Sequence, residues 1–585
     1  MVNRIIAIVL VVLAPLAARA DSDQSTRFRF EDATVAQLQA AMAAGRLTSE
    51  TLTRAYIARI LAFDQDGPGV NSVMELNPDA VAMARRADDL RRRGRVLGPL
   101  HGIPVLLKGN IDTGDRMQTT AGSLGLVGAP APRDSTVAAK LRAGGAVILG
   151  KTNLSEWANF RSFNSSSGWS AVGGLTNNPY GINRNACGSS SGSGAAATAN
   201  FAAVSLGTET DGSIVCPANA NGVVGIKPTV GLTSRAGVVP ISHTQDTVGP
   251  HGRTVADAAI ALAVIQSRAP DGRDAATAGV PLGWQGRARP TNIPADYTQF
   301  LDRDGLRGAR LGLTRSGIES APAQVGAAFD EVIEAIEAAG ATVIDLDAAG
   351  FEFAPADGEF LVLVYEFRDD LRNYLATRTR VPLAGKTLAD AIAFNEANAE
   401  AEMPFFAQEI FELANSLAPG PDDPQPAFGG MTYNQALEID RLSGVNGIDK
   451  ALADFDLDAV IAPTDNPAWA TDLLYGDRFL FGSSGLAAGA GYPIVQVPAS
   501  MVFGAPLGIS FFGTAFSEPT LIKLASGFEA VTRVRAQNPP TFALMLPDDH
   551  VDGTTLRRPR GAANQQAKQQ KAPPQETRSW RPRRM

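Results

Sequence analysis

Short apolar runs alternate with amphipathic segments along this chain, and this alternation is the feature that most limits how the chain can fold. Residues 103–107 are wholly apolar and have the length of a buried strand. Residues 136–143 have helical spacing, and residues 145–150 again fit a strand. The same order returns between residues 305 and 350. Sheets covered by helices produce this pattern, so the sequence predicts an α/β fold.

The rest of the chain fits one large domain. Amphipathic helices are expected between residues 33 and 94, and a helical insertion is expected at about 355–455. Further strands are predicted at residues 458–463 and 493–498. Because neither an internal repeat nor a linker is evident within residues 21–552, we predict a single domain despite a length that would suffice for three.

The first residues have the layout of a targeting segment. Residues 1–20 combine Arg4, a short apolar stretch and Ala-Arg-Ala before Asp21, so we expect a signal peptide that is removed after Ala20. The apolar stretch is too short to span a bilayer comfortably. The mature protein is therefore expected to be periplasmic or secreted, without stable membrane association.

The last residues differ from the body in charge. Residues 553–585 hold nine Lys and Arg against Glu576 alone and lack an apolar face, which predicts a disordered basic tail. The formal net charge of −8 therefore understates the acidity of residues 21–552. An acidic body does not suggest a nucleic-acid partner.

Lys108 follows the apolar run directly, at the carboxyl end of the predicted strand. Open α/β sheets tend to place ligands at such ends. Burial would favour the neutral amine, which can accept a proton, whereas a serine hydroxyl is a weak nucleophile until a base takes its proton. Lys108 is therefore a candidate base, because histidine, the usual one, is scarce. The histidines are His101, His243, His251 and His550.

Two glycine-rich clusters carry serines. Residues 188–194 read Gly-Ser-Ser-Ser-Gly-Ser-Gly and open a predicted helix of small residues. Residues 207–213 read Gly-Thr-Glu-Thr-Asp-Gly-Ser and follow a predicted strand. Glycines let backbone amides approach a reacting carbonyl, so this second cluster is a candidate oxyanion hole. Its expected N–H donors are Thr210, Asp211, Gly212 and Ser213.

These features together resemble the amidase signature family. The resemblance rests on Lys108, on the two clusters and on residues 223–228, Val-Val-Gly-Ile-Lys-Pro, and it extends over most of residues 30–530. It implies a single large α/β domain with a central mixed, twisted β-sheet covered by helices on both faces. It implies neither a cofactor nor a metal.

The resemblance also assigns roles. It implies that Ser213 is the acylated nucleophile, that Ser189 is a bridging serine held by a cis peptide bond, and that Lys108 is the base that drives the relay. The spacing of 24 residues between the two serines agrees with the family pattern and favours Ser189 over Ser190 or Ser191.

Within the family, the two clusters and residues 237–246 are most similar to bacterial peptide amidases, which remove the amide from peptide C-termini. We therefore expect an exported serine amidohydrolase that releases ammonia from a small-molecule or peptide amide. The insertion at 355–455 and residues 157–182 are expected to shape its pocket. The oligomeric state is left open.

Three positions depart from the family pattern. Ser191 and Asp211 stand where glycine is usual, and Val215 stands where arginine is common. Without that arginine, a salt bridge behind the nucleophile is in doubt. The Asp211 carboxylate would be unfavourable if it faced the oxyanion.

Two other enzyme classes are weighed against this hypothesis. Residues 188–192 also satisfy Gly-x-Ser-x-Gly, the pattern of α/β-hydrolase esterases, in which Ser190 would attack and His550 would complete a triad. That alternative is weak because residues 181–186 do not make a convincing strand. A glutaminase-type amidotransferase subunit is the other alternative, but an exported chain has no access to aminoacyl-tRNA.

Cys187 and Cys216 are the two cysteines of the chain, and they flank the serine clusters. In an oxidising compartment they can form a disulfide. Two small buried thiols fit the sequence equally well.

Overall fold

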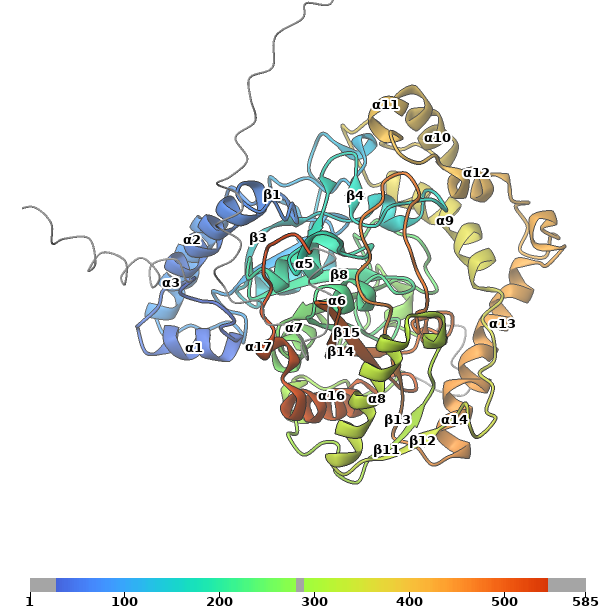
Figure 1. Ribbon diagram of the computed structural model, residues 1–585. Helices are drawn as coiled ribbons and strands as arrows, with labels where there is room; N and C mark the ends of the chain where they lie inside the picture. The colour runs from blue at the N-terminus through green and yellow to red at the C-terminus, as the bar shows by residue number, and fades with distance from the viewer. Residues whose placement is uncertain (1–27, 280–288, 546–585) are drawn as a thin grey trace, which may run out of the picture. The chain divides into compact units, whose positions relative to one another are not determined.

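A mixed sheet of eleven strands runs through the part of the chain that the structure describes, residues 28–279 and 289–545 (Figure 1). In this computed structural model the strands pair both parallel, as β2 does with its two neighbours, and antiparallel, as β10 does. The predicted α/β class and the mixed sheet are confirmed. In spatial order the strands are β1 (Val73–Leu76), β3 (Val147–Thr152), β2 (Pro104–Lys108), β8 (Val204–Glu209), β10 (Thr247–Gly252), β9 (Val224–Lys227), β14 (Ile494–Val502), β15 (Ala505–Phe512), β13 (Ala459–Pro463), β11 (Arg310–Leu313) and β12 (Thr342–Asp345).

Three expectations fall outside the described residues. They are the signal peptide at residues 1–20, the basic tail at residues 553–585 and the role of His550. None of the described helices combines the length and the apolar character needed to cross a membrane.

α-Helices form most of the remaining regular secondary structure in the described residues. They are α1 (Val35–Ala43), α2 (Ser49–Ile60), α3 (Ala80–Arg92), α4 (Thr136–Ala143), α5 (Ser191–Thr198), α6 (Val215–Ala220), α7 (Val255–Ile265), α8 (Ala323–Ala338), α9 (Glu359–Leu375), α10 (Leu388–Ala397), α11 (Ala399–Glu402), α12 (Glu409–Ser416), α13 (Tyr433–Asn446), α14 (Ile448–Asp454), α15 (Gly485–Ala488), α16 (Glu518–Thr532) and α17 (Val534–Gln537).

Strand β13 shows how helices cover both faces of the sheet. Ala459 and Ile461 belong to one hydrophobic cluster, which includes side chains of α7, α8 and α16. Val460 and Ala462 belong to another, which includes side chains of α6, α14 and α15. Successive strand residues point to opposite faces, so an apolar run without alternation requires cover on both. The expected two-sided cover is confirmed.

Helices α9 to α14 occupy the region where a helical insertion is expected, and Figure 1 shows α10, α11 and α12 grouped together in gold. Four of these helices, α9, α10, α12 and α13, share a hydrophobic cluster with Trp157 and Phe160. The loop that precedes the first serine cluster is therefore packed against the insertion, which positions one wall of the site.

One local expectation is corrected. Residues 181–186 do form a strand, since β7 (Gly181–Asn185) pairs with β6 (Asn177–Asn178) in a separate two-stranded ribbon. A second ribbon joins β4 (Trp169–Ser170) to β5 (Gly174–Leu175). Helix α5 begins at Ser191, inside the serine cluster, and all eight of its residues are buried. Tertiary burial thus overrides the weak helix propensity of serine and glycine.

Candidate active site

Lys108 is the last residue of β2, where parallel neighbours β3 and β8 flank it, and its side chain is fully buried. Its Nζ donates to Ser189 Oγ at 2.8 Å, to Thr208 Oγ1 at 2.8 Å and to the Thr208 carbonyl at 3.2 Å. Burial lowers the pKa of Lys108 to about 7, although the negative charges of Asp246 and Glu209 act in the opposite direction. A substantial fraction of this amine is therefore neutral at neutral pH.

Ser189 lies between Lys108 and Ser213. The Gly188–Ser189 peptide bond is cis, and the Ser189 Oγ donates to Ser213 Oγ at 3.0 Å. A Cβ at Gly188 would lie 2.2 Å from Ser155 Oγ, so only glycine fits at this position. The structure thus joins the three predicted residues in one continuous hydrogen-bonded chain.

Ser213 lies in the turn between β8 and α6, and its side chain is buried. Gly212 has a φ of 74°, a left-handed conformation that favours glycine immediately before the serine. After the serine, the Glu209 Oε2 accepts N–H bonds from Ile214 at 2.6 Å and from Val215 at 2.9 Å. The carboxylate thus satisfies amides at the start of α6 and fixes the turn that presents Ser213.

The expected oxyanion donors line a cavity of about 540 Å³. Within the described residues, no hydrogen bond occupies the backbone N–H groups of Asp211, Gly212 and Ser213. Free amides beside a nucleophile can stabilise the negative charge of a tetrahedral intermediate.

Asp246 accepts a hydrogen bond from the side chain of Thr210, the first of the expected oxyanion donors. Thr210 Oγ1 donates to Asp246 Oδ1 at 2.6 Å, and the amides of Ile241 and Ser242 donate to its Oδ2. Burial raises the pKa of Asp246 to about 6, against the effect of these hydrogen bonds. The carboxylate therefore ties the turn to the loop that precedes β10.

The structure shows the surroundings of two of the unusual positions, Val215 and Asp211. Val215 packs in a hydrophobic cluster. The fully buried Lys227 interacts electrostatically with both Glu209 and Asp211, and burial lowers its pKa. Asp211 is exposed within the cavity. Desolvation raises its pKa, whereas Ser484 and Lys227 act to lower it.

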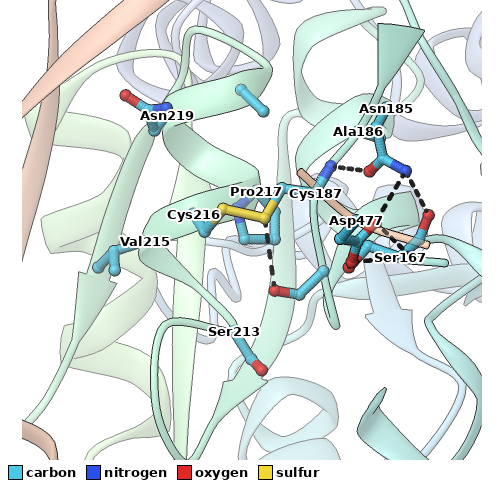
Figure 2. Close-up of a disulfide and its surroundings, with 12 residues drawn as sticks. Ser167, Asn185, Ala186, Cys187, Ser213, Val215, Cys216, Pro217, Asn219 and Asp477 are labelled. Atoms are coloured by element: carbon cyan, nitrogen blue, oxygen red, sulfur yellow. Dashed lines mark hydrogen bonds between the residues drawn. A yellow bond between two sulfur atoms is a disulfide. The ribbon is translucent and has the colours of Figure 1, made fainter. Parts of the chain in front are cut away.

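Cys187 and Cys216 form a disulfide, with their Cα atoms 5.9 Å apart. Figure 2 shows the bond close to Ser213, with the Cys187 N–H donating to the Asn185 side chain. Cys187 lies two residues before Ser189, and Cys216 lies three residues after Ser213. The bond therefore ties together the two segments that carry the serines.

The alternative nucleophile Ser190 is held differently. Its Oγ donates to the Thr208 carbonyl at 3.0 Å and accepts the Thr208 N–H at 3.2 Å. The residue is fully buried and does not line the cavity. Strand β7 before it belongs to a ribbon outside the central sheet, unlike the strand of a nucleophile elbow.

The described histidines lie outside this site. His251 is buried with Nε2 3.0 Å from the Ile214 carbonyl, and burial lowers its pKa to about 4. Burial also favours neutral His243, but a hydrogen bond to Asp370 and the charge of Glu366 outweigh it and raise the pKa to about 9. None of the three described histidines, the buried His101 included, lines the cavity beside Ser213.

Apolar side chains form much of the cavity wall. Ala158 and Phe160 come from the loop before the first serine cluster, and Leu363 comes from the insertion, as expected. Residues 479–482, 484 and 485 add another section, and Asp465 completes the wall. The sequence reasoning missed this last part, because nothing in the local pattern of residues 464–485 links them to the serine clusters.

Comparisons with known proteins agree with this geometry. The family model described as Amidase matches residues 51–522. A probable amidase of Arabidopsis thaliana is 41% identical over 530 residues, covering 88% of this chain and 93% of the relative. A glutamyl-tRNA(Gln) amidotransferase subunit of Chloroflexus aurantiacus is 33% identical over 513 residues, covering 86% of this chain and 98% of the relative.

A solved structure extends the likeness to three dimensions. The native peptide amidase of Stenotrophomonas maltophilia is 46% identical to this chain and superposes on it with a TM-score of 0.79. The match covers 88% of this chain and 100% of the solved chain. The match of the family model over most of the chain, together with these relatives, shows that the chain belongs to the amidase signature family and is a hydrolase that acts on amide bonds.

Proposed function

We propose that this amidase removes the terminal amide from peptide C-termini through an acyl-enzyme on Ser213. The chain of hydrogen bonds from Lys108 through Ser189 to Ser213 carries the proposal. It connects a buried amine of lowered pKa to a hydroxyl at the cavity surface.

The relay follows from the freedom of hydroxyl protons to rotate. With neutral Lys108, the Ser213 hydroxyl donates to Ser189, and the Ser189 hydroxyl donates to the amine. Lys108 then takes a proton from Ser189, Ser189 takes one from Ser213, and the Ser213 Oγ attacks the amide carbon.

The second half of the reaction reverses the proton flow. The amides of residues 210–213 stabilise the oxyanion, and each such donor contributes about 3–4 kcal/mol to transition-state stabilisation. The relay returns a proton to the departing nitrogen, which leaves as ammonia. Water then attacks the Ser213 ester and releases the free acid.

Two observations favour a peptide amide as the substrate. The chain is 46% identical to the peptide amidase of Stenotrophomonas maltophilia over 88% of its length. Among the described residues, those that line the cavity include Asp211 and Asp465 but no lysine, arginine or histidine. A peptide amide has no free carboxylate at its reacting end, so it needs no cationic partner there.

The same lining argues against the glutaminase alternative. Free glutamine carries an α-carboxylate a few bonds from its amide, and the described residues that line the cavity offer no cationic side chain to bind it. The 33% identity to an amidotransferase component therefore does not favour that activity here.

Serine replacements test the proposal. We expect ammonia release from C-terminally amidated peptides to disappear in Ser213→Ala and to fall strongly in Ser189→Ala. Ser190→Ala should still form an acyl-enzyme detectable by intact mass. Acylation lost in Ser190→Ala but kept in Ser213→Ala would establish the esterase-type alternative instead.

The proposal also includes export of the protein from the cytoplasm. Residues 1–20 have the composition of a secretory signal, and a disulfide beside the site suits an oxidising compartment. We expect the periplasmic or secreted fraction to contain a chain that begins at Asp21. N-terminal sequencing of fractionated cells tests this, and an intact Met1 in the cytoplasmic fraction would contradict it.

A further inference from the structure

Asp465 is a buried carboxylate in the cavity wall, and one of its oxygens lacks a hydrogen-bond partner among the described residues. Asp465 is only 4% exposed, yet its Oδ2 accepts no hydrogen bond from any residue that the structure describes. Desolvation raises its pKa well above the usual range, and the charges of Asp211 and Glu209 add to the shift. Buried carboxylates are normally paired, so this one points to a missing ligand.

The surrounding backbone leaves space for this side chain. Asp465 follows β13, and its backbone bridges to Gly482. A Cβ on Gly482 would lie 2.5 Å from Asp465 Oδ1, so any other residue would crowd the carboxylate. Both residues line the same cavity as Ser213.

Asp211 adds a second negative charge to the same cavity. Its charge raises the pKa of Asp465 and of Glu359, so the three carboxylates lie within electrostatic reach of one another. Lys227 counteracts this repulsion at Asp211 and Glu359, but it is fully buried and donates to the Tyr492 carbonyl. It is not among the residues that line the cavity.

From this geometry we infer that Asp465 and Asp211 form a subsite for an organic cation of the substrate, an ammonium or guanidinium group near the scissile amide. This inference rests on the proposed function. A bound cation would give Asp465 its missing hydrogen bonds and would relieve the repulsion among the carboxylates. Apolar walls from Phe160, Leu363 and Phe481 would cover its aliphatic part.

A metal ion fits this subsite less well. Among the described residues, His243, Glu366 and Asp370 form the group of three or more His, Cys, Asp or Glu side chains whose ligand atoms all lie within 4.8 Å of one another. Asp211 and Asp465 belong to no such group, which favours an occupant that brings its own hydrogen-bond donors.

Matched substrate pairs test the subsite and locate the charge. N-acetyl-arginine amide and N-acetyl-citrulline amide differ in side-chain charge at nearly equal shape. Leucine amide and N-acetyl-leucine amide differ in the α-ammonium. We expect wild type to prefer the cationic member of at least one pair by about tenfold or more in kcat/KM, as for a charge-assisted hydrogen bond. The pair that shows this preference identifies whether the side chain or the α-ammonium supplies the charge.

Two substitutions connect that preference to the aspartates. In Asp465→Asn and Asp211→Asn, the preference should fall to within about threefold, since a neutral amide side chain cannot neutralise the cation. Taking the ratio within a pair cancels any common loss of activity. Glu334→Gln, at an exposed position of α8, is the matched control and should keep the wild-type ratio.

Binding to the Ser213→Ala variant separates this inference from the proposed function. Calorimetry with the same amides requires no turnover, so a preference for the cationic member supports the subsite even if no ammonia is ever released. Equal binding within both pairs, or a kcat/KM ratio that survives both Asp→Asn substitutions, would overturn the inference.

Discussion

Two parts of the cavity, which we call the floor and the wall, differ in the kind of side chain that forms them. The catalytic floor, Lys108, Ser189 and Ser213, consists of buried polar groups that hydrogen-bond in a fixed order. The cavity wall, residues 158–160, Leu363, Asp465, 479–482, 484 and 485, is mainly apolar, and Phe479 is 52% exposed. Under the proposed mechanism, the floor would control the rate of the chemical step, whereas the wall would control which substrates bind. Four changes can break or sharpen this contrast.

Replacing the base should have the largest effect. We expect Lys108→Met to lower kcat by about 10³-fold or more, because no other group can take the proton from Ser189. Folding should survive, since an apolar chain of similar length replaces a desolvated amine. Ammonia release measures the effect, and Lys523→Met, at an exposed position of α16, is the control. A change in KM alone, with kcat unchanged, would show that Lys108 contributes to substrate binding and not to the chemical step.

Removing the disulfide should weaken the floor. The bond closes a loop across a separation of 29 residues, so Cys187→Ala with Cys216→Ala should lower the free energy of unfolding by about 3–4 kcal/mol. kcat should fall as well, because the two serine segments lose their link. Urea denaturation with and without reductant gives the measurement. If neither the two substitutions nor the reductant changed the urea midpoint of unfolding, packing alone would stabilise the floor.

The floor should also determine the pH dependence. Lys108 must be neutral to act, and its pKa is about 7, so kcat/KM should rise tenfold per pH unit below pH 7 and level off above about pH 8. Activity at pH 5 should thus be about one hundredth of the plateau. A pH–rate profile that is flat between pH 5 and pH 8 would contradict an uncharged lysine as the base.

Trimming the wall should have the smallest effect. Phe479→Ala removes a half-exposed ring, so KM should rise by about three- to tenfold while kcat stays within about twofold. Val531→Ala, which shortens an equally exposed side chain on α16 away from the cavity, should change neither constant. If Phe479→Ala instead reduced kcat at saturating substrate, the ring would take part in orienting the amide.

The sequence predicted the floor well because its elements are local. Lys108 ends an apolar run, and each serine belongs to a recognisable glycine-rich cluster, from which the family resemblance selects Ser189 and Ser213. The elements that carry them, β2, β8 and α6, are short and fully buried, and their residue types reflect that burial.

Only part of the wall could be predicted, because the section formed by Asp465 and the loop after it depends on long-range contacts. Asp465 and Gly482 meet only through the folding of β13 and the loop after it. Strand β10 was missed for a related reason, since Gly249 and Gly252 interrupt its apolar pattern. A Cβ at Gly249 would lie 1.9 Å from the Ile226 carbonyl, so glycine is present for close strand contact rather than for a turn.

The position of Asp465 and Gly482 late in the chain has a consequence for synthesis. A ribosome that has completed residue 450 has already made the lysine and both serines, but not the carboxylate or the rim at 479–485. The nascent chain would at that stage hold a nucleophile without a binding pocket. Selective substrate binding would thus become possible only after translation has passed residue 485, when all the residues that line the cavity have been made.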